Sequence, residues 1–107
     1  MKKNDSFKDY VLDQLQDVSG ITARPMFGGY GLYRESVFFG IIFKGRLFFK
    51  TDERTRVPYR ERGMKPFRPT PRQTLKNYFE VPVDAVEEPD ELARWAKDAI
   101  DCCRGGN

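Results

Sequence analysis

The chain has 107 residues, of which 39% are apolar and 33% charged, and its formal net charge at pH 7 is +3. This length predicts one domain with a single core and leaves no room for a second domain or an internal repeat. The longest apolar run has seven residues, far fewer than the roughly 20 that cross a bilayer, and no apolar segment follows the N-terminal lysines, so we expect a cytoplasmic protein without a membrane span.

The first predicted element is a helix over about Ser6 to Val18, with Ser6 as its N-cap. Its apolar residues recur at helical spacing: Phe7, Tyr10, Val11, Leu15 and Val18. The opposite face carries an aspartate at every fourth residue: Asp5, Asp9, Asp13 and Asp17. We interpret this acidic stripe either as a solvated face or as a surface that docks something basic.

The segment RPMFGGYGLY, Arg24 to Tyr33, places three glycines within four residues: Gly28, Gly29 and Gly31. A Walker loop would need a lysine and a hydroxyl residue before a helix, and a dinucleotide loop would need Gly-x-Gly-x-x-Gly opening a helix. The segment has neither pattern. We therefore predict that these glycines serve the fold, through positive φ angles or a close backbone approach where one strand turns into the next.

Aromatic and β-branched residues then predict two strands, SVFFGIIF and RLFFKT, joined by a tight hairpin at Lys44-Gly45. A further strand is expected around Asn77 to Val81. Simple alternation would point Phe38 and Ile42 to one face of the sheet, and three others to the opposite face: Phe39, Ile41 and Phe43. Both faces are then apolar, which suggests the hypothesis of a homodimer that buries one of them.

Between these strands lies a basic segment, residues 54–76. It holds one acid, Glu61, and eight cations, which are its candidate binding residues: Arg54, Arg56, Arg60, Arg62, Lys65, Arg68, Arg72 and Lys76. Its charge is +7, whereas the other eleven basic and fifteen acidic residues sum to −4. Because four prolines interrupt the segment, we expect no long helix except over Glu53 to Arg62. The segment is otherwise expected to be a long connection packed down at Met64 and Phe67 with its arginines outward.

The last predicted element is a helix that begins at Pro89 and ends at Gly105-Gly106. One apolar face is expected: Leu92, Trp95, Ala96, Ala99, Ile100 and Cys103. Trp95 is expected to be buried as its anchor. The adjacent thiols of Cys102 and Cys103 suggest either a redox pair or, as we favour, a Cys103 that continues the apolar face beside an incidental Cys102.

The chain contains no histidine, which removes the usual general base and the commonest metal ligand. We expect no metal site, no cofactor and no catalytic residue. Lys50 is a candidate nucleophile, because it ends an aromatic strand where burial would lower its pKa. The alternative is a strand-end lysine that reaches solvent or pairs with Asp52 or Glu53, and we favour this alternative.

Several of these motifs together resemble the TfoX (Sxy) N-terminal-domain family. RPMFGGYGLY, LFFKTDE, GMKPF, NYFEVP and DELARWAKDAI match its ordered motifs over roughly residues 5 to 103. The matching residues are Arg24, Phe27, Gly28, Gly29, Gly31, Lys50, Gly63, Pro66, Phe67, Tyr78 and Trp95.

The resemblance implies an α+β fold, an antiparallel sheet of about four to five strands flanked by an N-terminal and a C-terminal helix in a secretion-chaperone-like arrangement. Family members with a second, helical domain are regarded as positive regulators of competence genes that work with the cyclic-AMP receptor protein at promoters. The sequence ends at Asn107, so we expect a single-domain member that lacks that second domain. The family is not known for catalytic residues, and we expect no enzyme.

Three interpretations of the basic segment remain. It binds an acidic surface of a protein in transcription, which fits the resemblance best. Alternatively, it binds nucleic acid weakly and mainly through the backbone, with Tyr59 and Phe67 stacking on bases. In the third interpretation the acidic stripe of the first helix neutralises it, within one chain or between two. We predict a regulatory or adaptor domain that binds a protein partner.

Overall fold

The structure is a computed structural model that describes the backbone of residues 3–26 and 28–105 and the side chains of residues 6–26 and 28–103. It contains four helices and six strands in this part of the chain: α1 (Lys3–Gln14), β1 (Ile21–Met26), β2 (Gly29–Arg34), β3 (Val37–Phe43), β4 (Arg46–Lys50), α2 (Val57–Glu61), β5 (Pro66–Thr70), β6 (Gln73–Glu80), α3 (Val83–Val86) and α4 (Pro89–Gly105).

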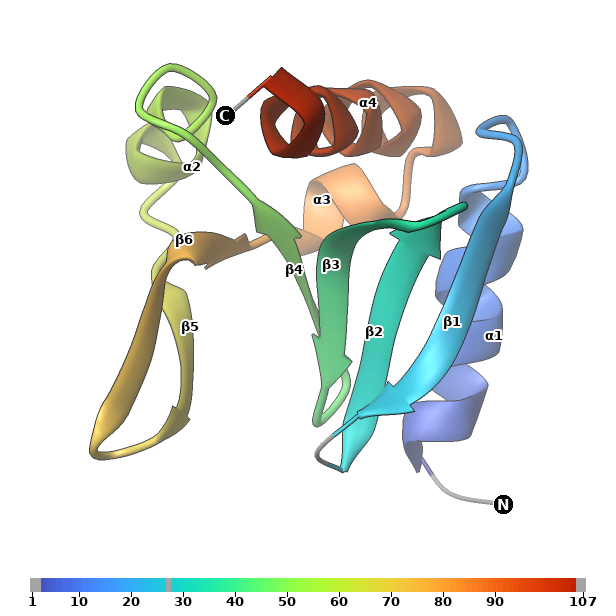
Figure 1. Cartoon of the computed structure of the whole chain (residues 1–107), viewed down its shortest axis with the longest axis horizontal. Coiled ribbons are helices and arrows are strands. Elements are labelled where there is room, and N and C mark those ends of the chain that lie inside the picture. Colours follow the sequence, from blue (N-terminus) through green and yellow to red (C-terminus); the bar gives the residue numbers. More distant parts are fainter. Residues whose placement is uncertain (1–2, 27, 106–107) are drawn as a thin grey trace.

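All strands pair antiparallel in one sheet of order β1-β2-β3-β4-β6-β5 (Figure 1). The α+β class and the two flanking helices are thus confirmed. The sheet has six strands where about four to five were expected, because the basic segment contributes β5 and the start of β6.

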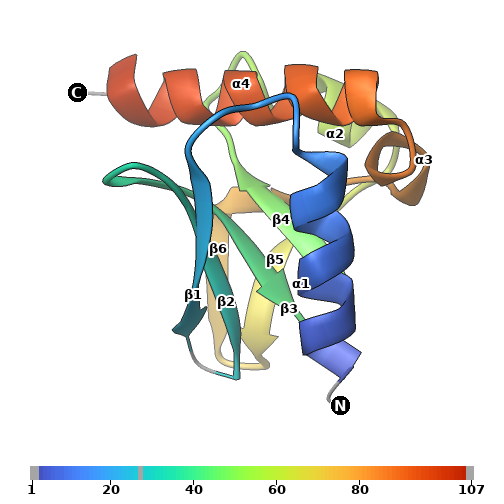
Figure 2. The same ribbon diagram turned by 90° about the vertical axis from the view of Figure 1, so that its right-hand side faces the viewer.

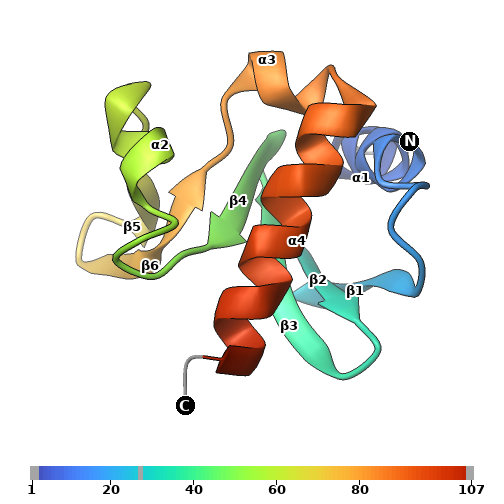
Figure 3. The same cartoon turned by 90° about the horizontal axis from the view of Figure 1, so that it is seen from above.

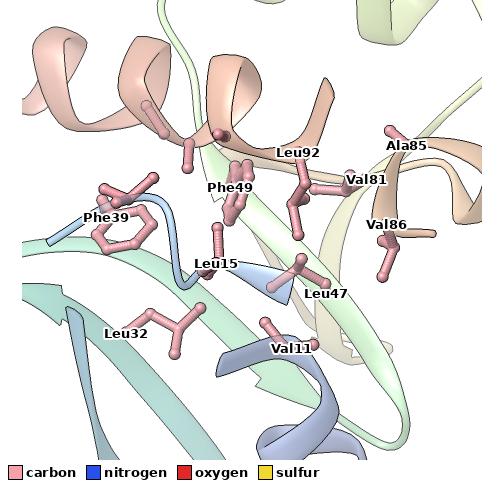
Figure 4. Packing of buried hydrophobic residues seen from close by; sticks show 14 of the residues in the cluster. Val11, Leu15, Leu32, Phe39, Leu47, Phe49, Val81, Ala85, Val86 and Leu92 are labelled. Atoms are coloured by element: carbon pink, nitrogen blue, oxygen red, sulfur yellow. The ribbon is translucent and has the colours of Figure 1, made fainter. Parts of the chain in front are cut away.

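Three helices, α1, α3 and α4, cover one face of this sheet (Figure 2). The main core lies beneath them and includes Val11 from α1, Leu32, Phe39 and Phe49 from the strands, and Leu92 from α4, each 0% exposed (Figure 4). The Gln14 amide donates a hydrogen bond of 3.0 Å to the Val86 carbonyl and so ties α1 to α3. These contacts fix the helices relative to the sheet.

The first helix differs from its prediction at both ends. It begins at Lys3, so Ser6 lies inside it and is not its N-cap, and it ends at Gln14. The chain then turns through residues 15–17, and Val18 still reaches the core at 5% exposure. Tyr10 is 40% exposed, because the buried face of the helix follows Val11 and Leu15.

The hairpin of β3 and β4 forms as predicted, with positive φ at both turn residues, Lys44 (51°) and Gly45 (73°). The predicted side-chain alternation along β3 is wrong. A register shift against β2 marks a bulge, because Leu32 pairs with Gly40 whereas Tyr33 pairs with Phe38. The extra residue reverses the phase of the strand, so Phe39 and Ile42 enter the main core.

The opposite face of the sheet carries a second apolar cluster. Its buried members are Ile41, Phe48 and Phe67, packed against five partly buried side chains: Met26, Phe38, Phe43, Leu75 and Tyr78. Phe67 comes from β5, and its ring centroid lies 4.5 Å from that of Phe48 and 5.4 Å from that of Phe43. The expectation of two apolar faces is therefore confirmed, and the chain covers the middle of the second face itself.

The last helix begins at Pro89 as predicted, and Leu92, Ala96, Ala99 and Ile100 are buried beneath it. Two details differ. Trp95 is only half-buried, because it lies toward α2 and not over the sheet. Cys102 is buried at 7% exposure whereas Cys103 is half-buried, the reverse of the expected roles. Within the described residues no helix combines the length and the apolar character needed to cross a membrane.

Candidate functional site

The basic segment is folded: its helix lies within the stretch allowed for one, Glu53 to Arg62, whereas its strands correct the expectation of a long connection. It forms α2, β5 and the first half of β6, and this part of the chain lies beyond α4 as seen from α1 (Figures 1 and 3). A reciprocal pair of hydrogen bonds starts its helical turns: the Asp52 N–H donates to the Thr55 hydroxyl (2.9 Å), and the Thr55 N–H donates to the Asp52 carboxylate (2.8 Å). The Thr55 N–H bond holds the pKa of the Asp52 carboxyl below its usual value.

Two of the eight cations contact side chains of other elements. The half-buried Arg56 donates hydrogen bonds to the Thr51 hydroxyl (3.1 Å) and to the Asn77 side-chain oxygen (2.9 Å), so it joins the start of α2 to β6. Arg62 forms an ion pair of 3.0 Å with Glu91 and lies 5.4 Å from the centre of the Trp95 ring. These contacts give Arg56 and Arg62 structural partners.

The six others are exposed, as predicted: Arg54, Arg60, Lys65, Arg68, Arg72 and Lys76. Within the described residues none of them forms an ion pair. Arg68 donates a hydrogen bond of 2.7 Å to the Pro71 carbonyl, inside the turn of the β5–β6 hairpin. We call these six side chains the basic surface. Met64 is half-buried and Phe67 is 1% exposed, so the segment is anchored where predicted.

Among the described side chains, the acidic stripe of the first helix does not neutralise the basic surface. The α1 helix lies at the β1 side of the sheet, with α4 between it and the basic segment (Figure 3). Asp9 pairs with Lys8 at 2.7 Å, and neither Asp9 nor Asp13 pairs with a described residue of segment 54–76. The side chain of Asp5 lies outside those that the structure describes. Neutralisation between two copies stays an untested prediction.

Base stacking by Tyr59 and Phe67, part of the nucleic-acid interpretation, is wrong. Tyr59 is 3% exposed and packs against Phe79 and Trp95, and Phe67 is 1% exposed inside the second cluster. Both rings anchor the segment, because each is buried in one of the two apolar clusters. A nucleic acid would need other rings.

Such rings form a row on the second face of the sheet. The Arg24 guanidinium lies 4.8 Å from the centre of the Tyr33 ring. The ring centroids of Tyr33 and Phe38 are 5.2 Å apart, and those of Phe38 and Tyr78 are 5.7 Å apart. The Lys50 ammonium stands 5.7 Å from the Tyr78 ring at the other end. Arg24 and Lys50, both residues of the family motifs, therefore flank three half-buried rings. Sequence reasoning missed this row because its members come from five different strands.

Gly28, Gly29 and Gly31 have structural roles, as predicted. Gly28 has a φ of +78° in the turn between β1 and β2. A Cβ on Gly29 would overlap the Ile42 carbonyl oxygen of β3, and one on Gly31 would crowd Phe38 and Met26. Phe27, the remaining residue predicted in this motif, lies outside the described residues.

A pocket of about 230 Å³ opens between α2, α4 and the end of β4. Tyr59 and Trp95 line the pocket, and their ring centroids are 4.6 Å apart with the rings edge to face. The paired Arg62 and Glu91 also line it. Lys50 and Asp98 are the other two charged groups that line the pocket. Two residues singled out by the family motifs, Lys50 and Trp95, thus share one pocket.

Lys50 also lies near the thiols at the end of α4. Neither Asp52 nor Glu53 pairs with it among the described residues, so that expected ion pair is absent. A hydrogen bond with Cys102 lowers the pKa of the Cys103 thiol to about 7, burial opposes this, and the Lys50 charge adds to the lowering. The same hydrogen bond and burial raise the pKa of Cys102. The Cys103 thiol donates to the Phe38 carbonyl at 3.2 Å.

Among residues 6–26 and 28–103, no group of three or more cysteine, aspartate or glutamate side chains is placed to hold a metal ion. The candidate sites are therefore the basic surface, the aromatic row and the pocket.

Comparison with known proteins identifies the family of this chain. The TfoX N-terminal domain matches residues 13–103 of this chain. The chain belongs to the TfoX N-terminal domain family. The DNA transformation protein TfoX1 of Aliivibrio fischeri is 29% identical to it over 83 residues, which are 76% of this chain and 40% of that protein. The TfoX N-terminal domain described here thus spans about two-fifths of the length of that relative.

Proposed function

We propose that this TfoX N-terminal domain is a non-enzymatic regulatory or adaptor domain of DNA transformation (competence), which binds an acidic surface of a protein in transcription. The observation that carries the proposal is the basic surface. Six exposed cations lie on α2, the β5–β6 hairpin and the segments next to them, and none has an acidic partner among the described residues. A surface of one sign speeds association with a partner of the opposite sign and selects against like-charged ones.

The relative and the family support the biological setting. The relative is a DNA transformation protein. The family resemblance implies that members with a second, helical domain work with the cyclic-AMP receptor protein at promoters. The proposed partner is therefore a protein of the transcription machinery, and the cyclic-AMP receptor protein is the first probe to use. We assign no catalytic residue to the domain.

The aromatic row supports a second candidate, a weak nucleic-acid module. Stacking of a base on an aromatic side chain contributes about 1–3 kcal/mol, and the row sets Tyr33, Phe38 and Tyr78 between two cations. The rings are only half-buried, so part of each face is open to a partner. Binding would be mainly to phosphates and strongly salt-dependent.

One experiment separates these candidates. The fluorescently labelled domain is titrated by anisotropy with purified cyclic-AMP receptor protein, with duplex DNA and with single-stranded DNA, each at two salt concentrations. The test variant removes three cations of the β5–β6 hairpin: Arg68→Ser, Arg72→Ser and Lys76→Ser. The control variant removes three exposed cations elsewhere: Lys44→Ser, Arg94→Ser and Lys97→Ser.

We expect the receptor protein to bind the wild-type domain and the control, and the hairpin variant to bind at least about 10-fold more weakly, since three charge contacts are lost. Binding of DNA alone, with affinity falling steeply as salt rises, would replace the proposal by its alternative. Equal loss in both variants would assign the effect to net charge, and no binding to any probe would overturn both candidates.

A further inference from the structure

The pocket between α2 and α4 holds two opposite charges that the fold leaves unpaired. Lys50 stands at the end of β4 and Asp98 on α4, and neither forms an ion pair with the other or with another described residue. The remaining charges at the pocket, Arg62 and Glu91, neutralise each other at 3.0 Å. The pocket lining therefore includes one cation and one anion that no ion pair among the described residues neutralises, and the Lys50 ammonium also lies 5.7 Å from the centre of the Tyr78 ring.

A tyrosine that lines the pocket also has a hydroxyl without a protein partner among the described residues. Tyr59 is 97% enclosed at 3% exposure, and its hydroxyl has no hydrogen-bond partner among the described residues. No fully enclosed side-chain nitrogen or oxygen in this part of the chain lacks a partner, so the hydroxyl is not fully enclosed, and it belongs to a residue that lines the pocket. Burial and the nearby Asp98 carboxylate raise its pKa, so the phenol stays neutral and can donate or accept a hydrogen bond.

The size and the walls limit the ligand further. Pockets for drug-sized ligands measure about 300–1,000 Å³, so a pocket of about 230 Å³ takes a smaller molecule. The Trp95 ring, Pro58 and Ala99 offer an apolar wall beside the charges. A simple anion would share the pocket with the unpaired Asp98 carboxylate, and a simple cation would share it with the unpaired Lys50 ammonium, so each is disfavoured.

We propose that this pocket binds a free zwitterionic amino acid with a large apolar or aromatic side chain, its carboxylate on Lys50 and its ammonium on Asp98. Tyr59 donates a hydrogen bond to the carboxylate, and the ligand side chain lies along Trp95. The site is distinct from the basic surface, so the inference goes beyond the proposed partner binding and stands or falls separately from it.

Trp95 provides the readout, because it is the single tryptophan of the chain and lies in the pocket wall. L-phenylalanine, which fluoresces little where tryptophan does, is titrated against the purified domain while Trp95 emission is recorded. Saturation-transfer NMR on the ligand serves as a second measurement, in case binding leaves the emission unchanged. We expect saturable binding with a dissociation constant of about 1 mM or below, as is reached by well-placed ligands of this size.

Two analogues and two variants test which charge meets which group. Phenethylamine lacks the carboxylate and 3-phenylpropionate lacks the ammonium, and each should bind at least about 10-fold more weakly than phenylalanine. Lys50→Met should weaken the binding of phenylalanine at least about 10-fold and leave the binding of phenethylamine unchanged. Asp98→Asn should weaken the binding of phenylalanine by a similar factor and leave the binding of 3-phenylpropionate unchanged. Tyr59→Phe keeps the packing of the ring but removes the hydroxyl, so it should weaken the binding of phenylalanine about 3- to 10-fold.

Lys97→Met and Asp101→Asn are the matched controls, because both residues are exposed on α4 and neither lines the pocket. Circular dichroism checks that every variant keeps the fold. No saturable binding by either method up to tens of millimolar phenylalanine would overturn the proposal. So would equal effects of the variants on all three ligands. Binding of phenylalaninamide as tight as that of phenylalanine would overturn it as well, since the site would then recognise a peptide N-terminus and not a free amino acid.

Discussion

At the scale of single residues, Gly29 shows why the RPMFGGYGLY motif belongs to the fold. The residue starts β2, where the backbone of β3 approaches so closely that a Cβ would overlap the Ile42 carbonyl oxygen and lie 3.3 Å from the Phe43 Cα. Both atoms belong to a paired strand and cannot rotate away as a side chain can. Gly29 is thus required for the pairing of β2 with β3.

Gly29→Ala should therefore lower the free energy of unfolding by about 3 kcal/mol or more, because the strands must separate to admit the methyl group. The measurement is urea denaturation followed by circular dichroism. Gly28→Ala is the neighbouring control: a Cβ there meets nothing within 4 Å, but its φ of +78° should still cost about 1–2 kcal/mol. Equal losses for the two variants would contradict the assignment of a close approach to Gly29.

At the scale of elements, the β5–β6 hairpin depends on one ring. Phe67 is the buried contact of β5, and it closes the second cluster over Phe48 and Phe43. The other residues of β5 are two prolines, an arginine and a threonine, so Phe67 is the buried side chain that holds this strand against the second cluster.

Phe67→Ala should destabilise the domain by about 3–5 kcal/mol, through lost burial and the cavity left over Phe48. Urea denaturation measures this change, and Val83→Ala, at a residue 65% exposed on α3, should change stability by less than about 0.5 kcal/mol. A Phe67→Ala variant as stable as the control would mean that β6 pairing alone holds the hairpin.

The same elements show what the sequence could and could not predict. The β3–β4 hairpin and α4 were predictable because local signals agree there: a turn glycine, aromatic strands, and a proline and acids at a helix start. The phase of β3 was not, since one bulge at Phe39–Gly40 exchanges the two faces and leaves no mark in composition. Strand β5 was missed because its prolines and arginines disfavour a strand, and only Phe67 and the pairing with β6 make it one.

At the scale of the whole molecule, the candidate sites depend on the topology more than on any motif. The cations of the basic surface were visible as a run in the sequence, and their exposure followed from it. The pocket was not visible, because Lys50, Tyr59 and Asp98 are brought together only by the packing of α2 against α4. The aromatic row is similar, since Arg24 and Tyr78 lie more than fifty positions apart in the chain.

The oligomeric state is the remaining question at this scale. The homodimer hypothesis rested on an apolar second sheet face, and the structure covers the middle of that face with Phe67. Among the described residues, the large apolar side chains that are clearly exposed are Tyr10, Val57 and Val83, which lie on α1, α2 and α3. A stable dimer buries about 1,200–2,000 Å² around an apolar centre, and the half-buried row is the part of the second face left to provide it.

We therefore expect light scattering at micromolar concentration to give the monomer mass of 12.5 kDa, because the row is narrow and Arg24 and Lys50 flank it. A mass twice as large would contradict this and restore the homodimer hypothesis. Tyr33→Ser would then locate the interface, since Tyr33 sits in the row on β2. A return to the monomer mass in that variant would place the dimer on the second face, whereas an unchanged dimer would place it on the helices, where the three exposed apolar side chains lie.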